Sequence, residues 1–119
     1  MTDGKWLEYV IGQFMDNTVK YRDVSRNLKI TVFAKENEKS VDFIYEDNGQ
    51  GISREDLPRI FDKSFTGDNG HNISKSTGMG LYIVKSLCDR LGHKISAESE
   101  KGEYTRFTIS FAKNDMHRF

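Results

Sequence analysis

The chain has 119 residues, with 18 acidic and 18 basic side chains and therefore no formal net charge. This length fits one domain, residues 1–119, with its own hydrophobic core, and the balanced charge excludes an overall attraction to nucleic acid or to an anionic membrane. The single cysteine excludes an internal disulfide, and no apolar run approaches the roughly 20 residues of a membrane-spanning helix, so we expect a soluble, cytosolic chain.

The first predicted helix spans residues 5–21, where apolar side chains recur at helical spacings. Within it, Gln13, Asn17 and Lys20 lie three or four positions apart and therefore share one side. The Asn17 amide could supply an oxygen to Mg²⁺, which prefers hard oxygen ligands, and Lys20 could place an ammonium near phosphates. Tyr21 could stack on a purine. The alternative is a solvated helix face beside a core tyrosine.

Two alternating segments, residues 28–32 and 41–45, flank a polar turn and predict an antiparallel hairpin. The second strand runs into Asp47-Asn48-Gly49-Gln50-Gly51-Ile52. Asp47 could accept a hydrogen bond from the exocyclic amine of adenine, while Gly51 and Ile52 let a flat ring lie against the backbone. An ordinary turn is the alternative.

A short helix, residues 53–60, is predicted next, because Ser53 can cap it. Phe61 and Phe65 follow and are interpreted as core aromatics at the base of a long loop, or as the hinge of a lid. The polar, glycine-bearing residues 66–77 predict that loop, and loops of such length in compact domains are usually functional.

The stretch Ser76-Thr77-Gly78-Met79-Gly80-Leu81 joins this loop to a predicted helix, residues 81–91. Free amides at a helix start carry partial positive charge, and glycines allow a phosphate to approach them closely. A flexible turn before a core helix is the alternative. Cys88 lies in the apolar pattern of this helix and is interpreted as core packing.

Gly92 is expected to end the helix, and residues 95–99 and 105–111 predict two strands around a Lys101-Gly102 turn. Residues 113–119 are expected to fray. His71, His93 and His117 are scattered without metal-site spacing and are interpreted as surface residues.

In this order, the motifs resemble the catalytic and ATP-binding domain of sensor histidine kinases, in the superfamily that also holds gyrase B, MutL and the large heat-shock ATPases. Residues 13–21 resemble the N box, residues 47–52 the G1 box, residues 59–65 the F box and residues 77–81 the G2 box. The sequence of residues 61–70 and 75–82 is most similar to that of kinases of Gram-positive bacteria that sense peptide antibiotics beside a transporter.

The resemblance implies an α/β fold of the Bergerat type, a two-layer α/β sandwich with a mixed sheet of about five strands, three helices on one face and a flexible ATP lid over residues 66–77. It implies ATP and Mg²⁺ as cofactors, Asn17 as the metal ligand, and Asn17, Lys20 and Lys63 as catalytic residues. The nucleotide-binding residues that it implies are Gln13, Asn17, Lys20, Tyr21, Asp47, Gly49, Gly51, Ile52, Phe61, Phe65, Lys75, Thr77, Gly78, Met79, Gly80 and Leu81.

The implied reaction is transfer of the γ-phosphoryl group of Mg-ATP to a histidine. Because no His-Glu-x-x-x-Pro motif occurs in the sequence, the acceptor is expected on a separate dimerisation domain of the same polypeptide, with a response regulator as the indirect partner. The parent protein is expected to be membrane-anchored and homodimeric and this fragment monomeric. Gln13 cannot act as the water-activating base that Glu supplies in related hydrolases, so poor hydrolysis is expected. The alternatives are an anti-sigma-type serine kinase of the same fold and a non-catalytic nucleotide-binding regulatory module.

Overall fold

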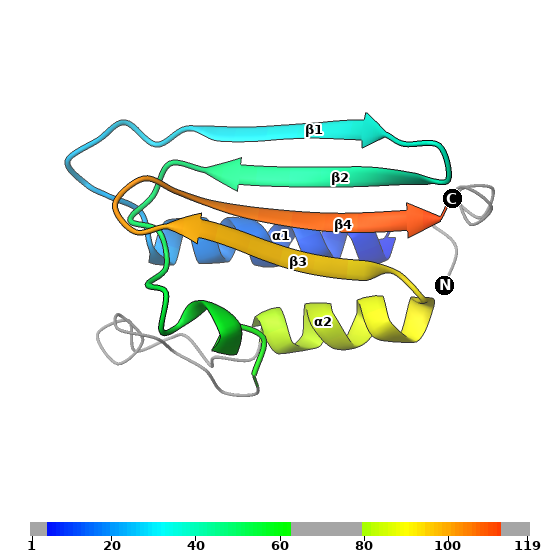
Figure 1. The fold of residues 1–119 in the computed structure, drawn as a ribbon. Coiled ribbons are helices and arrows are strands. Elements are labelled where there is room, and N and C mark those ends of the chain that lie inside the picture. The colour runs from blue at the N-terminus through cyan, green and yellow to red at the C-terminus, as the bar shows by residue number, and fades with distance from the viewer. Residues whose placement is uncertain (1–4, 63–79, 113–119) are drawn as a thin grey trace.

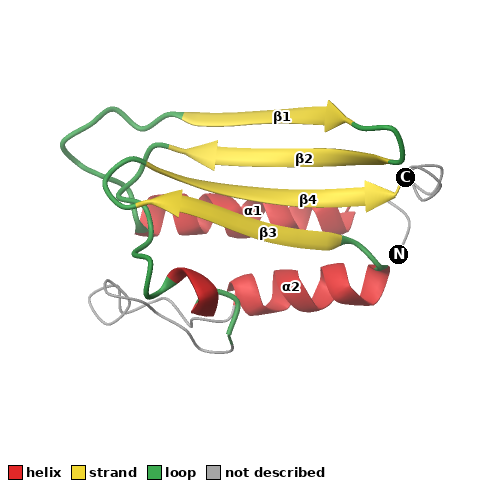
Figure 2. Ribbon diagram, viewed as in Figure 1, coloured by secondary structure: helices red, strands yellow, loops and turns green. Residues whose placement is uncertain are grey.

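A computed structural model describes residues 5–62 and 80–112, which form a sheet with helices on one face (Figures 1 and 2). The elements along the chain are α1 (Lys5–Lys20), β1 (Ile30–Glu36), β2 (Ser40–Asp47), the 3₁₀ helix η1 (Leu57–Arg59), α2 (Gly80–Leu91), β3 (Lys94–Glu100) and β4 (Tyr104–Ala112). Neither α-helix is long and apolar enough to cross a membrane. The predicted helices at residues 5–21 and 81–91 and all four predicted strands are confirmed.

The sheet has the strand order β1-β2-β4-β3, and every neighbouring pair is antiparallel. The prediction of a mixed sheet of about five strands with three helices is therefore wrong for the described residues, which form four strands and two α-helices. The physical reason is local. One short turn joins β1 to β2 and another joins β3 to β4, and such short connections pair strands antiparallel, which accounts for two of the three strand pairs.

The predicted helix at residues 53–60 is also shorter than expected. Ser53 makes the capping contact, because its Oγ accepts a hydrogen bond from the Asp56 N–H at 3.2 Å. Only Leu57–Arg59 is helical, as a 3₁₀ turn. Pro58 lies inside that turn and offers no backbone N–H to extend it.

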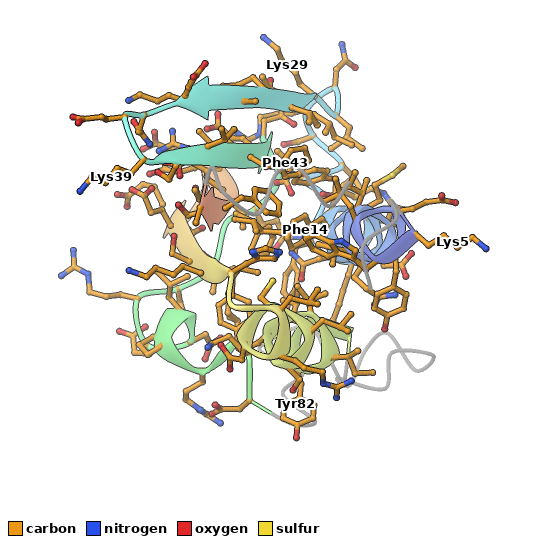
Figure 3. All side chains as sticks on the ribbon, turned by 90° about the vertical axis from the view of Figure 1, so that its right-hand side faces the viewer. Lys5, Phe14, Lys29, Lys39, Phe43 and Tyr82 are labelled. Atoms are coloured by element: carbon orange, nitrogen blue, oxygen red, sulfur yellow. The ribbon has the colours of Figure 1, made fainter. Side chains whose placement is uncertain are left out.

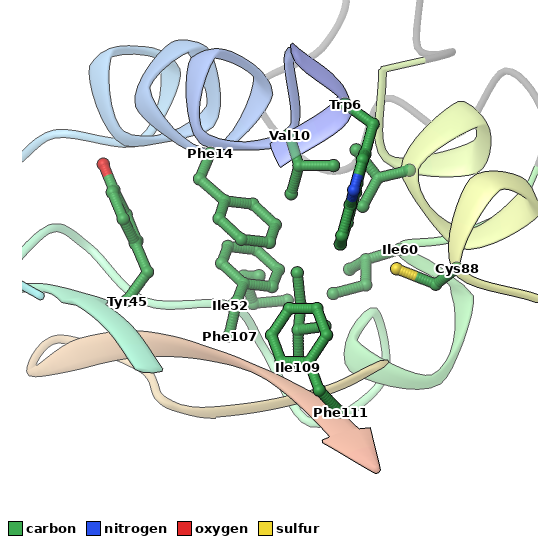
Figure 4. Close-up of a cluster of buried hydrophobic side chains, with 11 residues drawn as sticks. Trp6, Val10, Phe14, Tyr45, Ile52, Ile60, Cys88, Phe107, Ile109 and Phe111 are labelled. Atoms are coloured by element: carbon green, nitrogen blue, oxygen red, sulfur yellow. The ribbon is translucent and has the colours of Figure 1, made fainter. Parts of the chain in front are cut away.

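The core fills the space between the sheet and the helices (Figures 3 and 4). Trp6, Val10 and Phe14 recur every fourth position on α1, and each is at most 3% exposed. In Figure 3, Phe14 points between the layers, whereas Lys5 points away from them. The rings of Phe14 and Phe107 stack with centroids 4.4 Å apart. Alternate residues of β4 complete this core, as period-two burial requires.

Cys88 is fully buried on α2, so its interpretation as core packing is confirmed. The interpretation of His93 as a surface residue is wrong, because its side chain is only 8% exposed. Its ring stacks on Trp6 with centroids 5.2 Å apart and meets the edge of Phe111. Gly92 adopts a positive φ of 81°, which turns the chain back so that the His93 N–H donates to the Cys88 carbonyl.

Several predictions of the sequence analysis fall outside the described residues. They concern the loop at residues 66–77, the C-terminal tail, and the residues Lys63, Phe65, His71, Lys75, Thr77, Gly78, Met79 and His117.

Candidate functional site

The last turns of α1 carry Asn17 and Thr18, two buried polar residues. Thr18 lies one turn beyond Phe14, on the stripe that faces the sheet. Asn17 lies one turn beyond Gln13, whose side-chain oxygen lies against Gly80 at the start of α2. The end of α1 therefore presents a hydroxyl to the sheet and an amide toward the side on which α2 begins.

Asp47 ends β2 and is 3% exposed. Its Oδ2 accepts a hydrogen bond from the Thr18 hydroxyl at 2.7 Å, and its Oδ1 accepts one from the Gly49 N–H at 2.9 Å. The described residues supply Asp47 with no cationic partner. A buried carboxylate has several acceptor positions to satisfy. Asp47 therefore keeps acceptor capacity for a donor from a ligand, as its predicted role requires.

Two further buried residues with hydroxyl groups, Tyr45 and Thr105, lie near this carboxylate. The Tyr45 hydroxyl lies 2.7 Å from Thr18 Oγ1, and burial raises the pKa of Tyr45 above its ordinary value. Thr105 stands opposite Asp47 in the β2–β4 register and is 1% exposed. The sequence analysis missed Thr18, Tyr45 and Thr105. Two signals were available for them, because Thr18 follows the Phe14 stripe and Tyr45 lies on the same strand face as Asp47.

Asn17 shows an unmet hydrogen-bonding requirement. Its side chain is 9% exposed, and among the described residues no partner lies near Nδ2. The two ends of a side-chain amide can exchange positions by a rotation, so the same place can present the oxygen. No cluster of three acidic, histidine or cysteine side chains that could hold an ion occurs in the described ranges. Asn17 could therefore offer one hard oxygen to Mg²⁺, and its role as a metal ligand stays a prediction.

Lys20 and Tyr21 lie where α1 ends. The Lys20 ammonium is 5.3 Å from the centroid of the Tyr21 ring, and burial lowers the pKa of Lys20 from its usual value. The Tyr21 carbonyl accepts a hydrogen bond from the Gln50 N–H at 2.8 Å. The structure therefore brings this end of the helix beside the loop that follows Asp47.

Hydrogen bonds fasten that loop to the segment between α1 and β1. Asn48 accepts from the Lys29 N–H at 2.8 Å and donates to the Asn27 carbonyl at 2.9 Å. Arg26 donates to the Gly49 carbonyl at 2.6 Å. A Cβ at Gly49 would lie 2.7 Å from the Tyr21 carbonyl oxygen. Gly49 is therefore needed for this close approach of two backbone segments.

Gly51 and Ile52 occupy a tighter setting than an open purine pocket. Gly51 has a φ of 75°, and a Cβ there would overlap the carbonyl of Glu100, the last residue of β3 before the turn to β4. The Ile52 side chain is 6% exposed within the core, and its N–H donates to Ser99 Oγ at 2.7 Å. Both residues hold the loop against the β3–β4 turn, and their contact with a base stays a prediction.

The remaining described candidates lie around the start of α2. A Cβ at Gly80 would overlap Gln13 Oε1, so the two helices approach closely here. Leu81 and Phe61 are partly buried against the core, and the Phe61 ring meets Phe107 edge-on at 6.4 Å. The structure thus brings Gln13, Gly80 and Leu81 together, on the side of α1 that also carries Asn17.

The sequence and the fold both match known proteins. The sequence model for the histidine kinase-, DNA gyrase B-, and HSP90-like ATPases matches residues 2–115. The sensor histidine kinase YxdK of Bacillus subtilis is 40% identical over 111 residues, which cover 92% of this chain and 34% of that protein. The sensor protein BceS of the same organism is 41% identical over 111 residues, which cover 93% and 32%. The chain therefore spans about a third of the length of these relatives.

Among solved structures, a mycobacterial sensor histidine kinase, MprB, has a TM-score of 0.77. The match covers 92% of this chain and 74% of that chain at 18% identity. At that identity the similarity establishes the fold alone.

Proposed function

Because this chain belongs to the family of histidine kinase-, DNA gyrase B- and HSP90-like ATPases, we propose that it is the ATP-binding catalytic domain of a two-component sensor histidine kinase. It would bind Mg-ATP and deliver the γ-phosphoryl group to a histidine on a dimerisation domain of the same polypeptide. The resemblance deduced from the motifs is confirmed at the level of the family.

The observation that carries this proposal is the buried Asp47 carboxylate. Thr18, on α1, and Gly49, in the loop that follows β2, each donate a hydrogen bond to one of its two oxygens. A buried acceptor held in place by hydrogen bonds suits the exocyclic amine of adenine. The Asn17 amide lies next to Thr18 on α1 and offers a polar group to the phosphate end of the same ligand.

Phosphoryl transfer requires alignment of the reacting groups and neutralisation of phosphate charge, with little covalent chemistry from the protein. Mg²⁺, when bound, would neutralise charge on the phosphate oxygens, and Asn17 would hold it. Lys20 would place positive charge beside the phosphates, and Lys63 and the amides of residues 78–81 would add to it. These assignments follow the family resemblance position by position.

The relatives support the wider assignment. YxdK and BceS are named as a sensor histidine kinase and a sensor protein, which favours histidine over serine as the acceptor. We further propose that the chain belongs with the kinases that sense peptide antibiotics, because the sequences of residues 61–70 and 75–82 resemble theirs. The parent protein would then be a membrane-anchored homodimer that passes its phosphoryl group to a response regulator.

Calorimetric titration with ATP, with and without Mg²⁺, tests the nucleotide site. The unmodified chain is expected to bind in the micromolar to millimolar range, about 4 to 8 kcal/mol. Asp47→Asn should abolish measurable binding, because the amide places a donor where the adenine amine needs an acceptor. Glu46→Gln is the matched control, since Glu46 points to the opposite face and pairs there with Arg106. Equal binding by Asp47→Asn and the unmodified chain would contradict the proposal.

Transfer itself is tested with radiolabelled ATP and the histidine-bearing segment of the parent protein. Acid-labile, base-stable phosphate on that segment is expected, because phosphohistidine hydrolyses in acid. Acid-stable phosphate on a serine would instead identify the serine kinase of the same fold.

A further inference from the structure

A line of three buried polar groups lies beneath the proposed adenine site. The Tyr45 hydroxyl, the Thr18 hydroxyl and the Asp47 carboxylate follow one another with separations of 2.7 Å and 2.7 Å. The three residues are 1%, 1% and 3% exposed. We call this line the hydroxyl relay. Tyr45 and Asp47 come from β2 and Thr18 from α1, so the relay joins the two layers of the fold.

The direction of the hydrogen bonds in the relay is fixed. A threonine hydroxyl has one proton, and Thr18 donates it to Asp47 Oδ2. The contact between Thr18 and Tyr45 must therefore use the Tyr45 proton. Gly49 donates its N–H to the other carboxylate oxygen. The Thr18 hydroxyl and the Gly49 N–H thus both donate to the carboxylate, and each of its two oxygens acts as an acceptor.

We propose that Thr18 and Tyr45 are positioning residues that make the site select a purine with an amine at position 6 over one with a carbonyl at that position. The inference rests on the proposed function and goes beyond it, because it assigns base selectivity to two residues that do not themselves meet the base. A carboxylate held as an acceptor pairs with an amine, whereas a carbonyl oxygen in the same place would face an acceptor. Sites built around such a hydrogen bond reject analogues that lack it.

Tyr45 contributes at one remove from the carboxylate. Thr18 accepts the Tyr45 proton through one lone pair of its oxygen and donates its own proton to Asp47, so the contact with Tyr45 favours the orientation of the Thr18 hydroxyl that reaches the carboxylate. Hydrogen bonds in such a chain polarise one another in a buried setting. Without the Tyr45 hydroxyl, Thr18 can rotate and its donation to Asp47 weakens.

The test measures dissociation constants for ATP and inosine triphosphate, ITP, which carries a carbonyl at position 6. The unmodified chain is expected to bind ATP at least about tenfold more tightly than ITP. Thr18→Val, which keeps the shape and removes the hydroxyl, should weaken ATP binding about tenfold and bring the two constants within about threefold. Tyr45→Phe should lower the preference for ATP about threefold.

Three controls separate positioning from folding. Thr18→Ser keeps the hydroxyl and should retain the preference for ATP. Thr108→Val removes a threonine hydroxyl from the opposite face of the sheet and should change neither constant. The double variant Thr18→Val/Tyr45→Phe should match Thr18→Val, because a relay already broken at Thr18 cannot be broken again.

Each contrary result has a distinct meaning. If Thr18→Val weakens ATP and ITP equally, its role is structural and the inference is overturned. Additive losses in the double variant would show that Tyr45 acts independently of Thr18, which also overturns it. If Thr18→Val fails to fold, Tyr45→Phe, which removes only one oxygen, tests the inference instead. An unchanged ratio of the ITP and ATP dissociation constants in Tyr45→Phe would then overturn it. An unmodified chain that binds ATP and ITP equally would overturn the inference alone, whereas one that binds neither would overturn the proposed function as well.

Discussion

The Asn17 side chain is buried at the end of α1, and the described part of the protein offers its Nδ2 atom no partner. Buried amides are almost always hydrogen-bonded, and leaving one unsatisfied lowers the free energy of unfolding. Natural proteins accept such a loss where a ligand later supplies the partner. Asn17 therefore has the property expected of a residue kept for binding rather than for stability.

Asn17→Leu is accordingly expected to leave the free energy of unfolding within about 1 kcal/mol of the native value, or to raise it. The same variant should lose the increase in ATP affinity that Mg²⁺ provides. Urea unfolding and calorimetry with and without Mg²⁺ measure the two effects. Asn48→Leu is the matched control, since the Asn48 amide makes two hydrogen bonds, and it should lose about 1–2 kcal/mol of stability. Marked destabilisation by Asn17→Leu would show that its amide is already bonded in the free chain.

Cys88 is expected to make the free energy of unfolding depend on pH. Burial raises the pKa of its thiol from 9.0 to about 11. The unfolded chain then loses this proton at lower pH than the folded chain, so the thiol's contribution to stability is complete below pH 9 and is lost as the pH rises toward 11. The free energy of unfolding should fall over this range by about 1–3 kcal/mol more in the native chain than in Cys88→Ala. Parallel pH profiles of the two chains would contradict this assignment.

At the scale of elements, two glycines with positive φ have different reasons for being glycine. Gly51 and Gly92 have φ values of 75° and 81°. A Cβ at Gly51 would overlap the backbone of the β3–β4 turn, whereas a Cβ at Gly92 would meet no described atom within 4 Å. Gly92 therefore serves only the backbone turn after α2, while Gly51 also allows two loops to pack.

Gly92→Ala is expected to lower the free energy of unfolding by about 1 kcal/mol, which is the strain of a left-handed backbone at alanine. Gly51→Ala should lose at least about 2 kcal/mol more, because the loops must separate as well. Urea unfolding of both variants gives the difference. Equal losses would mean that the loop after Asp47 is not held against the β3–β4 turn in solution.

The sequence was sufficient for the two α-helices and the four strands, and insufficient for the contacts between them. Apolar periodicity and turn residues placed both α-helices and both hairpins, because these signals are local. Thr18 and Asp47 are 29 positions apart, and spacing within one helix cannot show which side chain of the sheet it meets. His93 was misplaced for a similar reason, since its burial depends on Trp6 and Phe111, which are distant in the sequence.

At the scale of the whole molecule, the helix layer is narrower than the sheet. Val32 and Tyr45 stand opposite each other on β1 and β2 and share a face, yet Tyr45 is 1% exposed and Val32 is 49% exposed. Every residue of β1 is exposed, and Figure 3 shows this strand at the edge of the sheet away from α2. The core and the candidate site therefore lie under β2, β4 and β3, and β1 contributes chiefly its backbone pairing to β2.

This asymmetry predicts how the molecule tolerates charge. Val32→Lys is expected to change the free energy of unfolding by less than about 1 kcal/mol, because the lysine remains in water. Ile109→Lys, on the same face of β4 and fully buried, should prevent folding, since it places an unpaired charge in the core. Val32→Lys should also reduce self-association of the protein at high concentration, because charged side chains protect open sheet edges, and sedimentation velocity measures this change.

ATP affinity should stay unchanged in Val32→Lys, as β1 supplies no side chain to the candidate site. Destabilisation by Val32→Lys of more than about 2 kcal/mol would show that the inner face of β1 is covered in solution and that the helix layer extends across the whole sheet.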